Sequence, residues 1–295
     1  MNRRHFLSTS MLTALGLTAC GSDDGEVDTG RDFNHPLTVP EALLGTVVNG
    51  TTSYDLTLQQ GSSHFLNDVS TPTWGINGSF LGPTLRLRNG DKVRLNYTNT
   101  LGEDTTMHAH GVHLPASMDG GPHQIIKAGA SWTAAFTVDQ LACTNWYHPH
   151  YKGKTAQHVM NGLAGLIIVD DETSDALDLP KRYGVDDLPI IVQDRTFNSD
   201  GSFRYEPSMR ETMHGWKGNT LMVNGAIRPF VDVEAKQVRF RILNGSNARV
   251  YTLAFASGRS FQQIATDNSF LESPVTLTEL RLSPAERAEI VVDFS

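Results

Sequence analysis

Four of the eleven histidines fall into two His-x-His pairs, His108 with His110 and His148 with His150. Residues two apart in a strand project from the same face, roughly 6.5 to 7 Å apart, so each pair offers two imidazoles to one pocket. Neutral imidazole binds copper, zinc, iron and nickel, and the spacing selects none of them. Structural or surface histidines would give the same spacing. The pairs therefore predict a metal site whose metal the spacing leaves open.

The segments that must position these pairs have the pattern of strands. Polar and apolar residues alternate through residues 54–58 and 93–97, and Gly and Pro recur about every ten residues. Asn89-Gly90 has the composition of a hairpin turn between residues 85–87 and Val93. The sequence lacks sustained helical periodicity. It predicts an all-β fold of antiparallel strands, arranged as Greek-key sandwiches.

An internal repeat indicates two such sandwiches. Residues 76–78 followed by 93–99 match residues 223–225 followed by 238–244. The predicted domains are residues 36–172 and 188–295, with a charged linker over residues 173–187.

The repeat also predicts an incomplete second copy. In the frame of the first copy, the second lacks counterparts of residues 145–150 and 163–169. An unpaired sheet edge would result, which natural domains avoid. We therefore expect the sequence to be the N-terminal part of a longer protein, with its second sandwich truncated at the C-terminus.

The first residues resemble an export signal. Arg3-Arg4 followed by Phe6-Leu7 is similar to a twin-arginine motif, and residues 17–20, Leu-Thr-Ala-Cys, are similar to a lipobox. The run 8–19 is shorter than the roughly 20 apolar residues of a membrane-spanning helix. We expect residues 1–19 to be a signal peptide, Cys20 to be acylated and residues 20–35 to be a flexible tether. The protein is then exported, and lipid-anchored in the periplasm or cell envelope.

Composition excludes other classes. The 295 residues include 24 basic and 32 acidic side chains, a formal net charge of −8, which argues against a nucleic-acid partner. With Cys20 acylated, Cys143 is the single thiol left, so an intrachain disulfide is excluded.

Longer motifs around the histidine pairs resemble the first domain of multicopper oxidases. They lie in residues 108–121, with His-Ala-His-Gly-Val-His and Asp-Gly-Gly, in residues 145–155, Asn-Trp-Tyr-His-Pro-His-Tyr-Lys-Gly-Lys-Thr, and in residues 162–170. Residues 221–225 and 241–249 resemble the family's second domain. The resemblance covers nearly all of the chain after the signal and is strongest to the bacterial cuprous-oxidase and bilirubin-oxidase-like branch. It implies tandem cupredoxin-like sandwiches.

The resemblance also implies copper. In the family, eight histidines from the first and third cupredoxin domains hold three coppers, where O2 is reduced to water. By position, His108 would be the type 2 ligand, His110 and His148 would share one type 3 copper, and His150 would hold the other. The family's remaining ligands come from His-Pro-x-His-x-His and His-Cys-His motifs, which this sequence lacks. A missing third domain is therefore implied.

A type 1 copper, which accepts electrons, needs a Cys thiolate with two histidines and usually a Met. Pro149 stands where a His-Cys-His motif has its Cys, and Cys143 stands alone. Two-domain copper nitrite reductases keep a type 1 site in their first domain, and His158 would fit their later histidine, but Leu163 stands in place of Met. We expect the type 1 copper only in the missing domain.

The second copy offers no comparable ligands. At the positions that correspond to the first histidine pair it has Leu253 and Phe255, which cannot bind copper. Met209 and Met213 are expected to be packing residues.

Asp119 lies in the Asp-Gly-Gly turn after the first pair, at a position resembling the family's proton-donating carboxylate. Reduction of O2 to water consumes protons, which a carboxyl group beside the coppers would deliver. A plain turn aspartate before glycine is the alternative. We predict the catalytic role for Asp119.

These features together predict an exported multicopper oxidase, an oxidoreductase with O2 as acceptor. Its donor would be a small reducing substrate such as Cu(I), a phenol or a bilirubin-like pigment. This chain would supply half of the trinuclear site and would be inactive alone. The alternative is a cupredoxin-like envelope lipoprotein that binds or scaffolds partners and holds no copper or one copper. Copper-free relatives of that kind have lost the paired histidines, which this chain keeps.

Overall fold

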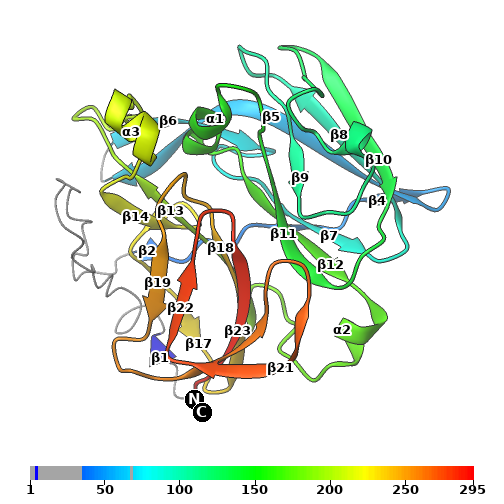
Figure 1. The fold of residues 1–295 in the computed structure, drawn as a ribbon, viewed down its shortest axis with the longest axis vertical. Coiled ribbons are helices and arrows are strands. Elements are labelled where there is room, and N and C mark those ends of the chain that lie inside the picture. The colour runs from blue at the N-terminus through cyan, green and yellow to red at the C-terminus, as the bar shows by residue number, and fades with distance from the viewer. Residues whose placement is uncertain (1–3, 6–34, 67–68) are drawn as a thin grey trace.

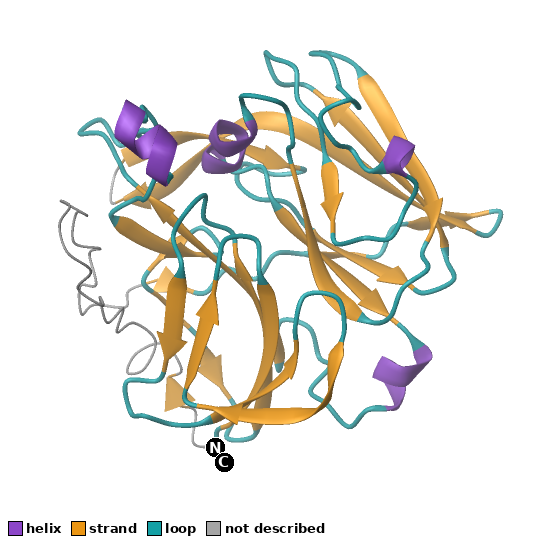
Figure 2. Ribbon diagram, in the orientation of Figure 1, coloured by secondary structure: helices purple, strands orange, loops and turns teal. Residues whose placement is uncertain are grey.

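The computed structural model describes residues 4–5, 35–66 and 69–295. Strands make up most of the fold, and the helices are few and short (Figure 2). Two β-sandwiches follow each other along the chain, the first in blue to green and the second in yellow to red (Figure 1). The predicted all-β class of tandem sandwiches is confirmed.

The first sandwich consists of two sheets. One has the strand order β10 (Ser131–Thr137), β8 (Lys92–Asn99), β5 (Thr51–Leu66) and β4 (Thr46–Val48), with β6 (Val69–Ile76) paired to β5. The other has the order β3 (Ala42–Leu43), β7 (Thr84–Arg88), β12 (Gly165–Asp170), β11 (Cys143–His148) and β9 (His108–His110). His108, His110 and His148 therefore lie on two neighbouring strands at one edge of the second sheet.

Two expectations about these strands are wrong. Asn89-Gly90 makes a turn, with Gly90 at φ 89°, but it does not make a hairpin, because β7 and β8 belong to opposite sheets. The strands are also not uniformly antiparallel, since β5 pairs with β8 and β7 pairs with β12 in parallel. A turn motif predicts that the chain reverses direction, but it does not predict which strands the two flanking strands pair with.

The second sandwich is built on a seven-stranded sheet. Its order is β15 (Ala226–Ile227), β14 (Thr220–Val223), β13 (Asp187–Arg195), β18 (Gln237–Asn244), β23 (Arg287–Asp293), β20 (Phe261–Ala265) and β21 (Phe270–Leu277). Three two-stranded ribbons accompany it: β19 (Tyr251–Ala254) with β22 (Glu279–Leu282), β16 (Pro229–Phe230) with β2 (His35–Pro36), and β17 (Asp232–Val233) with β1 (Arg4–His5).

Each sandwich encloses its own apolar core. In β8 the buried Val93, Leu95 and Tyr97 alternate with more exposed neighbours, as a strand with one face on a core requires. The second core lies between the seven-stranded sheet and the β19–β22 ribbon, and it includes Phe240 and Leu282. Burial of apolar surface in the two cores is the main stabilising contribution.

Strand β11 is buried along its whole length because it also faces the second sandwich. Trp146 packs in a third apolar cluster that contains Leu166 from β12, Ile191 from β13 and Leu243 from β18. Polar contacts join the same surfaces. The Thr144 hydroxyl donates to Glu289 Oε1 at 2.6 Å and accepts from Arg241.

The two residues that contact Thr144, Arg241 and Glu289, belong to a buried ion-pair network. Arg241 pairs with Asp187 through two nitrogens at 2.8 and 3.0 Å, and both Arg239 and Arg241 contact Glu289. All four side chains are at most 5% exposed, so each charge depends on the others for compensation. The network ties β11 to the second sandwich.

Helices occur where none was expected. They are α1 (Thr155–Asn161), α2 (Glu172–Ala176), α3 (Met209–His214) and the 3-10 turn η1 (Ala116–Met118). Among the described residues, no helix combines the length and apolarity needed to cross a bilayer. Met209 and Met213 are 83% and 76% exposed on α3, so the expectation that they are packing residues is wrong. The predicted lipidation site Cys20 lies outside the described residues.

Candidate metal centre

The two histidine pairs meet because β9 and β11 are neighbouring antiparallel strands. Their register places His108 opposite His148 and Trp146 opposite His110. Residues directly opposite in an antiparallel pair project from the same face. His108, His110, Trp146 and His148 therefore share one face, while Ala109 and Tyr147 point into the first core. A two-residue period on two adjacent strands is sufficient to gather the imidazoles.

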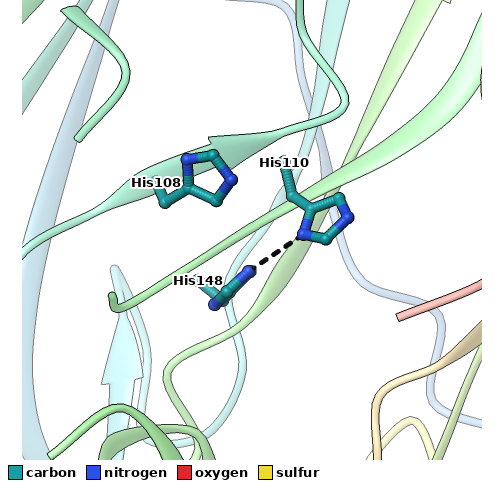
Figure 3. Close-up of side chains that lie close together, drawn as sticks. All are labelled: His108, His110 and His148. Carbon is teal, nitrogen blue, oxygen red and sulfur yellow. Dashed lines mark hydrogen bonds between the residues drawn. The ribbon is translucent and has the colours of Figure 1, made fainter. Parts of the chain in front are cut away.

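Three of the rings converge on one point. Nδ1 of His110 and Nε2 of His148 are hydrogen-bonded at 3.2 Å. Figure 3 marks this bond between the two rings. Ligand nitrogens of His108, His110 and His148 all lie within 4.8 Å of one another. All three potential metal-ligand atoms are imidazole nitrogens, and none is a carboxylate oxygen.

His150 stands slightly apart from these three. It follows the end of β11, its side chain is exposed, and its ring centroid lies 5.5 Å from that of His108 and 6.1 Å from that of His148. All four predicted ligands are thus brought to one region. His113, in contrast, is exposed and lies beyond the end of β9.

Hydrogen bonds to the far ring nitrogens fix two of the imidazoles. His148 donates from Nδ1 to the Pro149 carbonyl at 2.8 Å, which leaves the lone pair of Nε2 facing His110. His108 Nδ1 lies 3.0 Å from both the backbone oxygen and Oδ1 of Asp119, which leaves Nε2 free. Such partners set the tautomer and orientation of metal-binding histidines.

The Asp-Gly-Gly turn explains how Asp119 reaches His108. Gly120 has φ +71°, and a Cβ at this position would collide with the Met107 carbonyl. Only glycine permits the turn to lie this close to β9. The turn is fixed further by the Ala109 amide, which donates to the Asp119 carbonyl at 3.2 Å. Asp119 therefore contacts a predicted ligand, and its half-exposed carboxylate also faces solvent.

Burial keeps the central imidazoles neutral. It lowers the pKa of His148 well below its usual range, and the neighbouring His108 adds to this effect. Burial, followed by the charges of Arg287, His108 and His150, lowers the pKa of His110 to about 4. A neutral imidazole has the free lone pair that a metal requires. Both residues are therefore ready to bind a cation at neutral pH without losing a proton first.

The geometry of the closest pair fits a transition metal. Ions of the zinc and copper class bind imidazole nitrogen at about 2.0–2.1 Å, so a 3.2 Å separation corresponds to an angle of roughly 100° at the metal. This angle is close to tetrahedral. The absence of oxygen donors among these ligand atoms disfavours magnesium and calcium.

Trp146 is a site residue that was not among the predicted ligands. Its indole stacks on His148 with ring centroids 3.9 Å apart and planes 22° apart, and it lies 5.3 Å from the His110 ring. The signal was present, because Trp146 precedes His148 by two residues and so shares its face. The contact excludes water from one face of His148.

Cys143 lies on the opposite side of β11, in the first core. Its sulfur accepts hydrogen bonds from the Gln140 and Asn145 amides. Burial raises the pKa of this thiol to about 11. The thiol therefore stays protonated and lies among amide groups.

Comparison with known proteins agrees with this geometry. Two family models, both described as "Multicopper oxidase", match residues 57–174 and 141–295. "Cell division protein FtsP" from Xenorhabdus nematophila is 40% identical over 296 residues, 100% of this chain and 60% of that protein. "Multicopper oxidase mco" from Staphylococcus epidermidis is 42% identical over 247 residues, 84% of this chain and 54% of that protein.

Solved structures give the same result. A laccase from Pediococcus acidilactici superposes with a TM-score of 0.88 and 36% identity, over 93% of this chain and 59% of the laccase. The chain thus spans 54–60% of the length of these three relatives.

Proposed function

Because this chain belongs to the multicopper oxidase family, we propose that its four paired histidines form half of a trinuclear copper site that reduces O2 to water. His108 would bind the type 2 copper, His110 and His148 one type 3 copper, and His150 the other. The observation that supports this most directly is the 3.2 Å approach of His110 Nδ1 to His148 Nε2, two nitrogens with a metal-ligand spacing.

Copper bound at these imidazoles supplies the one-electron redox steps that O2 reduction requires. The protein's own groups orient the ligands and handle protons. Asp119 holds His108 in position and, being half-exposed, can exchange protons with solvent on one side and face the site on the other. This position supports its proposed role as proton donor. Trp146 and the buried environment of His148 keep water away from that ligand.

The other half of the site belongs, in this proposal, to a third cupredoxin domain of the full-length protein, which would also carry the type 1 copper. Support comes from the family and from the relatives' greater length. The electron donor would be a small reducing compound such as Cu(I), a phenol or a bilirubin-like pigment. The twin-arginine and lipobox motifs support export to the periplasm or cell envelope, with anchoring through Cys20.

A second candidate is a cupredoxin-like envelope protein that binds or scaffolds partners and holds no copper or a single copper. It is favoured by the 40% identity to a protein named for cell division over the whole chain. The two candidates differ in what the histidine cluster does.

Copper stoichiometry distinguishes them. The 295-residue chain is stripped of metal, titrated with Cu(II) and analysed for bound copper, beside His108→Ala, His148→Ala and the control His113→Ala. Binding of more than one Cu(II) per chain that only the first two substitutions reduce supports the oxidase site. A single bound Cu(II), no bound copper in the wild type, or equal binding in all variants supports the scaffold.

A further inference from the structure

The position of His150 is not set by the sheet. His148 is the last residue of β11, and His150 lies in the loop that follows it. The His150 amide donates to the Thr106 hydroxyl at 2.7 Å. This bond attaches the start of the loop to the segment that leads into β9, where His108 and His110 lie.

The end of the same loop returns to the same segment. Helix α1 begins at Thr155, and its His158 side chain has Nδ1 2.9 Å from the hydroxyl of Thr105, the neighbour of Thr106. His158 Nε2 lies 2.7 Å from Glu103 Oε1. The loop from His150 to α1 is therefore held at both ends by residues 103–106.

The loop is held along its length as well. Lys154 Nζ lies 3.4 Å from Glu103 Oε2. The Tyr151 ring, directly after His150, faces the His158 ring with planes 18° apart and centroids 6.3 Å apart. On another side, Trp74 from β6 packs on the same imidazole at 5.1 Å. His158 is 0% exposed, so its ring is fully enclosed between these groups.

We propose that His158 is a positioning residue that, through Thr105 and Glu103, fixes where His150 lies relative to the other three histidines. The inference rests on the proposed function, because it concerns the fourth ligand of that site. An apolar side chain of the same size would fill the space but leave the Thr105 hydroxyl and the Glu103 carboxylate without this partner. We call the contacts of His158 with Thr105 and Glu103 the brace. Residues 103–106 end two positions before His108, so the brace makes the His150 loop and β9 move together.

The first test is a double-mutant cycle on copper affinity. Thr105→Val removes the hydroxyl with little change in shape, and we expect it to weaken Cu(II) binding by the 295-residue chain about 10-fold, as loss of a group that orients a ligand does. If Thr105 acts through His150, the double variant Thr105→Val/His150→Ala should bind no more weakly than His150→Ala alone. Additive losses would overturn the proposal.

The matched control is Thr71→Val. Thr71 is also fully buried in the first sandwich. Its hydroxyl donates to the Gly201 carbonyl at 2.6 Å, and both residues are distant in sequence from the histidine pairs. An equal loss of affinity in this variant would mean that Thr105 contributes only to general stability. His158→Asn and His158→Gln separate the two contacts, since Asn replaces Nδ1 and Gln replaces Nε2. We expect the copper affinity of His158→Asn to be closer to that of the wild type than the affinity of His158→Gln is, because Asn keeps a partner for the Thr105 hydroxyl.

The second test needs no metal. Hydrogen–deuterium exchange of the metal-free chain, followed by mass spectrometry, reports protection of the peptide 149–155 and of β12. Thr105→Val and His158→Gln should speed exchange in residues 149–155 and leave β12 unchanged, whereas Thr71→Val should change neither. Unchanged exchange in the loop would refute the brace. If the wild type binds no copper, the proposed function fails, and this measurement still decides the positioning of His150.

Discussion

Nδ1 of His110 faces Nε2 of His148 at 3.2 Å, although 38 positions separate the two residues in the sequence. The antiparallel register of β9 and β11 creates this approach. The bond from His148 Nδ1 to Pro149 directs the opposite nitrogen of that ring toward His110. The two nitrogens share a hydrogen bond in the metal-free chain and lie at the spacing of a two-imidazole chelate.

The first prediction concerns the order of the ligands. His110→Ala or His148→Ala should weaken Cu(II) binding more than His150→Ala, because the first two residues form the close pair and His150 stands apart. Isothermal titration with Cu(II) measures the affinities, with His113→Ala as control. An equal or larger loss for His150→Ala would contradict this ranking.

Asp119→Asn should lower copper affinity by about 10–100-fold, the usual effect of altering a group that orients a metal-binding histidine. The amide can no longer accept a charge-assisted hydrogen bond from His108 Nδ1. Asp139→Asn, at an exposed aspartate of the same sandwich, is the control. Equal affinities for wild type and Asp119→Asn would show that the contact does not orient the ligand.

The copper-loaded 295-residue chain should lack the intense thiolate-to-copper absorption band and should have negligible oxidase turnover. The Cys143 thiol is protonated at neutral pH and lies among amide groups in the first core. Visible absorption spectra of the wild type and Cys143→Ser should coincide. A blue preparation whose colour Cys143→Ser removes would place a type 1 site within this chain.

Glu289→Gln should lower the free energy of unfolding by about 3–5 kcal/mol, because it removes one partner of a buried charge network. Two arginines and the Thr144 hydroxyl depend on this carboxylate. Urea unfolding at neutral pH measures the effect. Glu234→Gln, in ion pairs on the surface, should change stability by less than about 1 kcal/mol. Similar losses in both variants would argue against a special role for the buried network.

Stability should also depend on the protonation of His158. Burial lowers the pKa of this histidine, with Glu103 acting to raise it and Lys154 to lower it, and Tyr151 packs against its ring. In the unfolded chain His158 has a pKa of about 6.5, so as the pH falls it is protonated in the unfolded chain before it is protonated in the folded chain. The stability that neutral His158 contributes is therefore present above about pH 6.5 and declines below it.

The comparison of wild type with His158→Gln isolates this effect. Urea unfolding is measured at about pH 7.5 and about pH 5.5, and the stability difference between the two proteins should narrow at the lower pH. Effects of the other histidines cancel in that difference. A gap that stays constant or widens would show that folding does not lower the pKa of His158.

Local patterns in the sequence predict part of this structure well. A two-residue period predicts which face of a strand carries a side chain, and so it predicts that His108 and His110 share one pocket. His150 lies in the loop after β11, where this period does not fix its position. The same period places Trp146 beside His148. Tandem sandwiches follow from the repeat of strand motifs.

Other features depend on contacts between distant residues. Whether β7 and β8 form a hairpin or lie in opposite sheets depends on their other partners, and Asn89-Gly90 carries no information about those. Helix α1 has seven residues, too few for a periodic pattern to stand out. The contacts of His158 with Glu103 and Thr105 span 55 and 53 positions, so no local spacing indicates them.

The polar contacts between β11 and the second sandwich limit which domains of related proteins can be exchanged with those of this protein. Arg287 donates to the Thr144 carbonyl and to the Asn145 side chain, and Glu289 accepts from the Thr144 hydroxyl. A chimaera that exchanged the second sandwich for that of a relative would also exchange the groups that support the ligand strand. A functional chimaera would have to take β11 and β23 from the same parent protein.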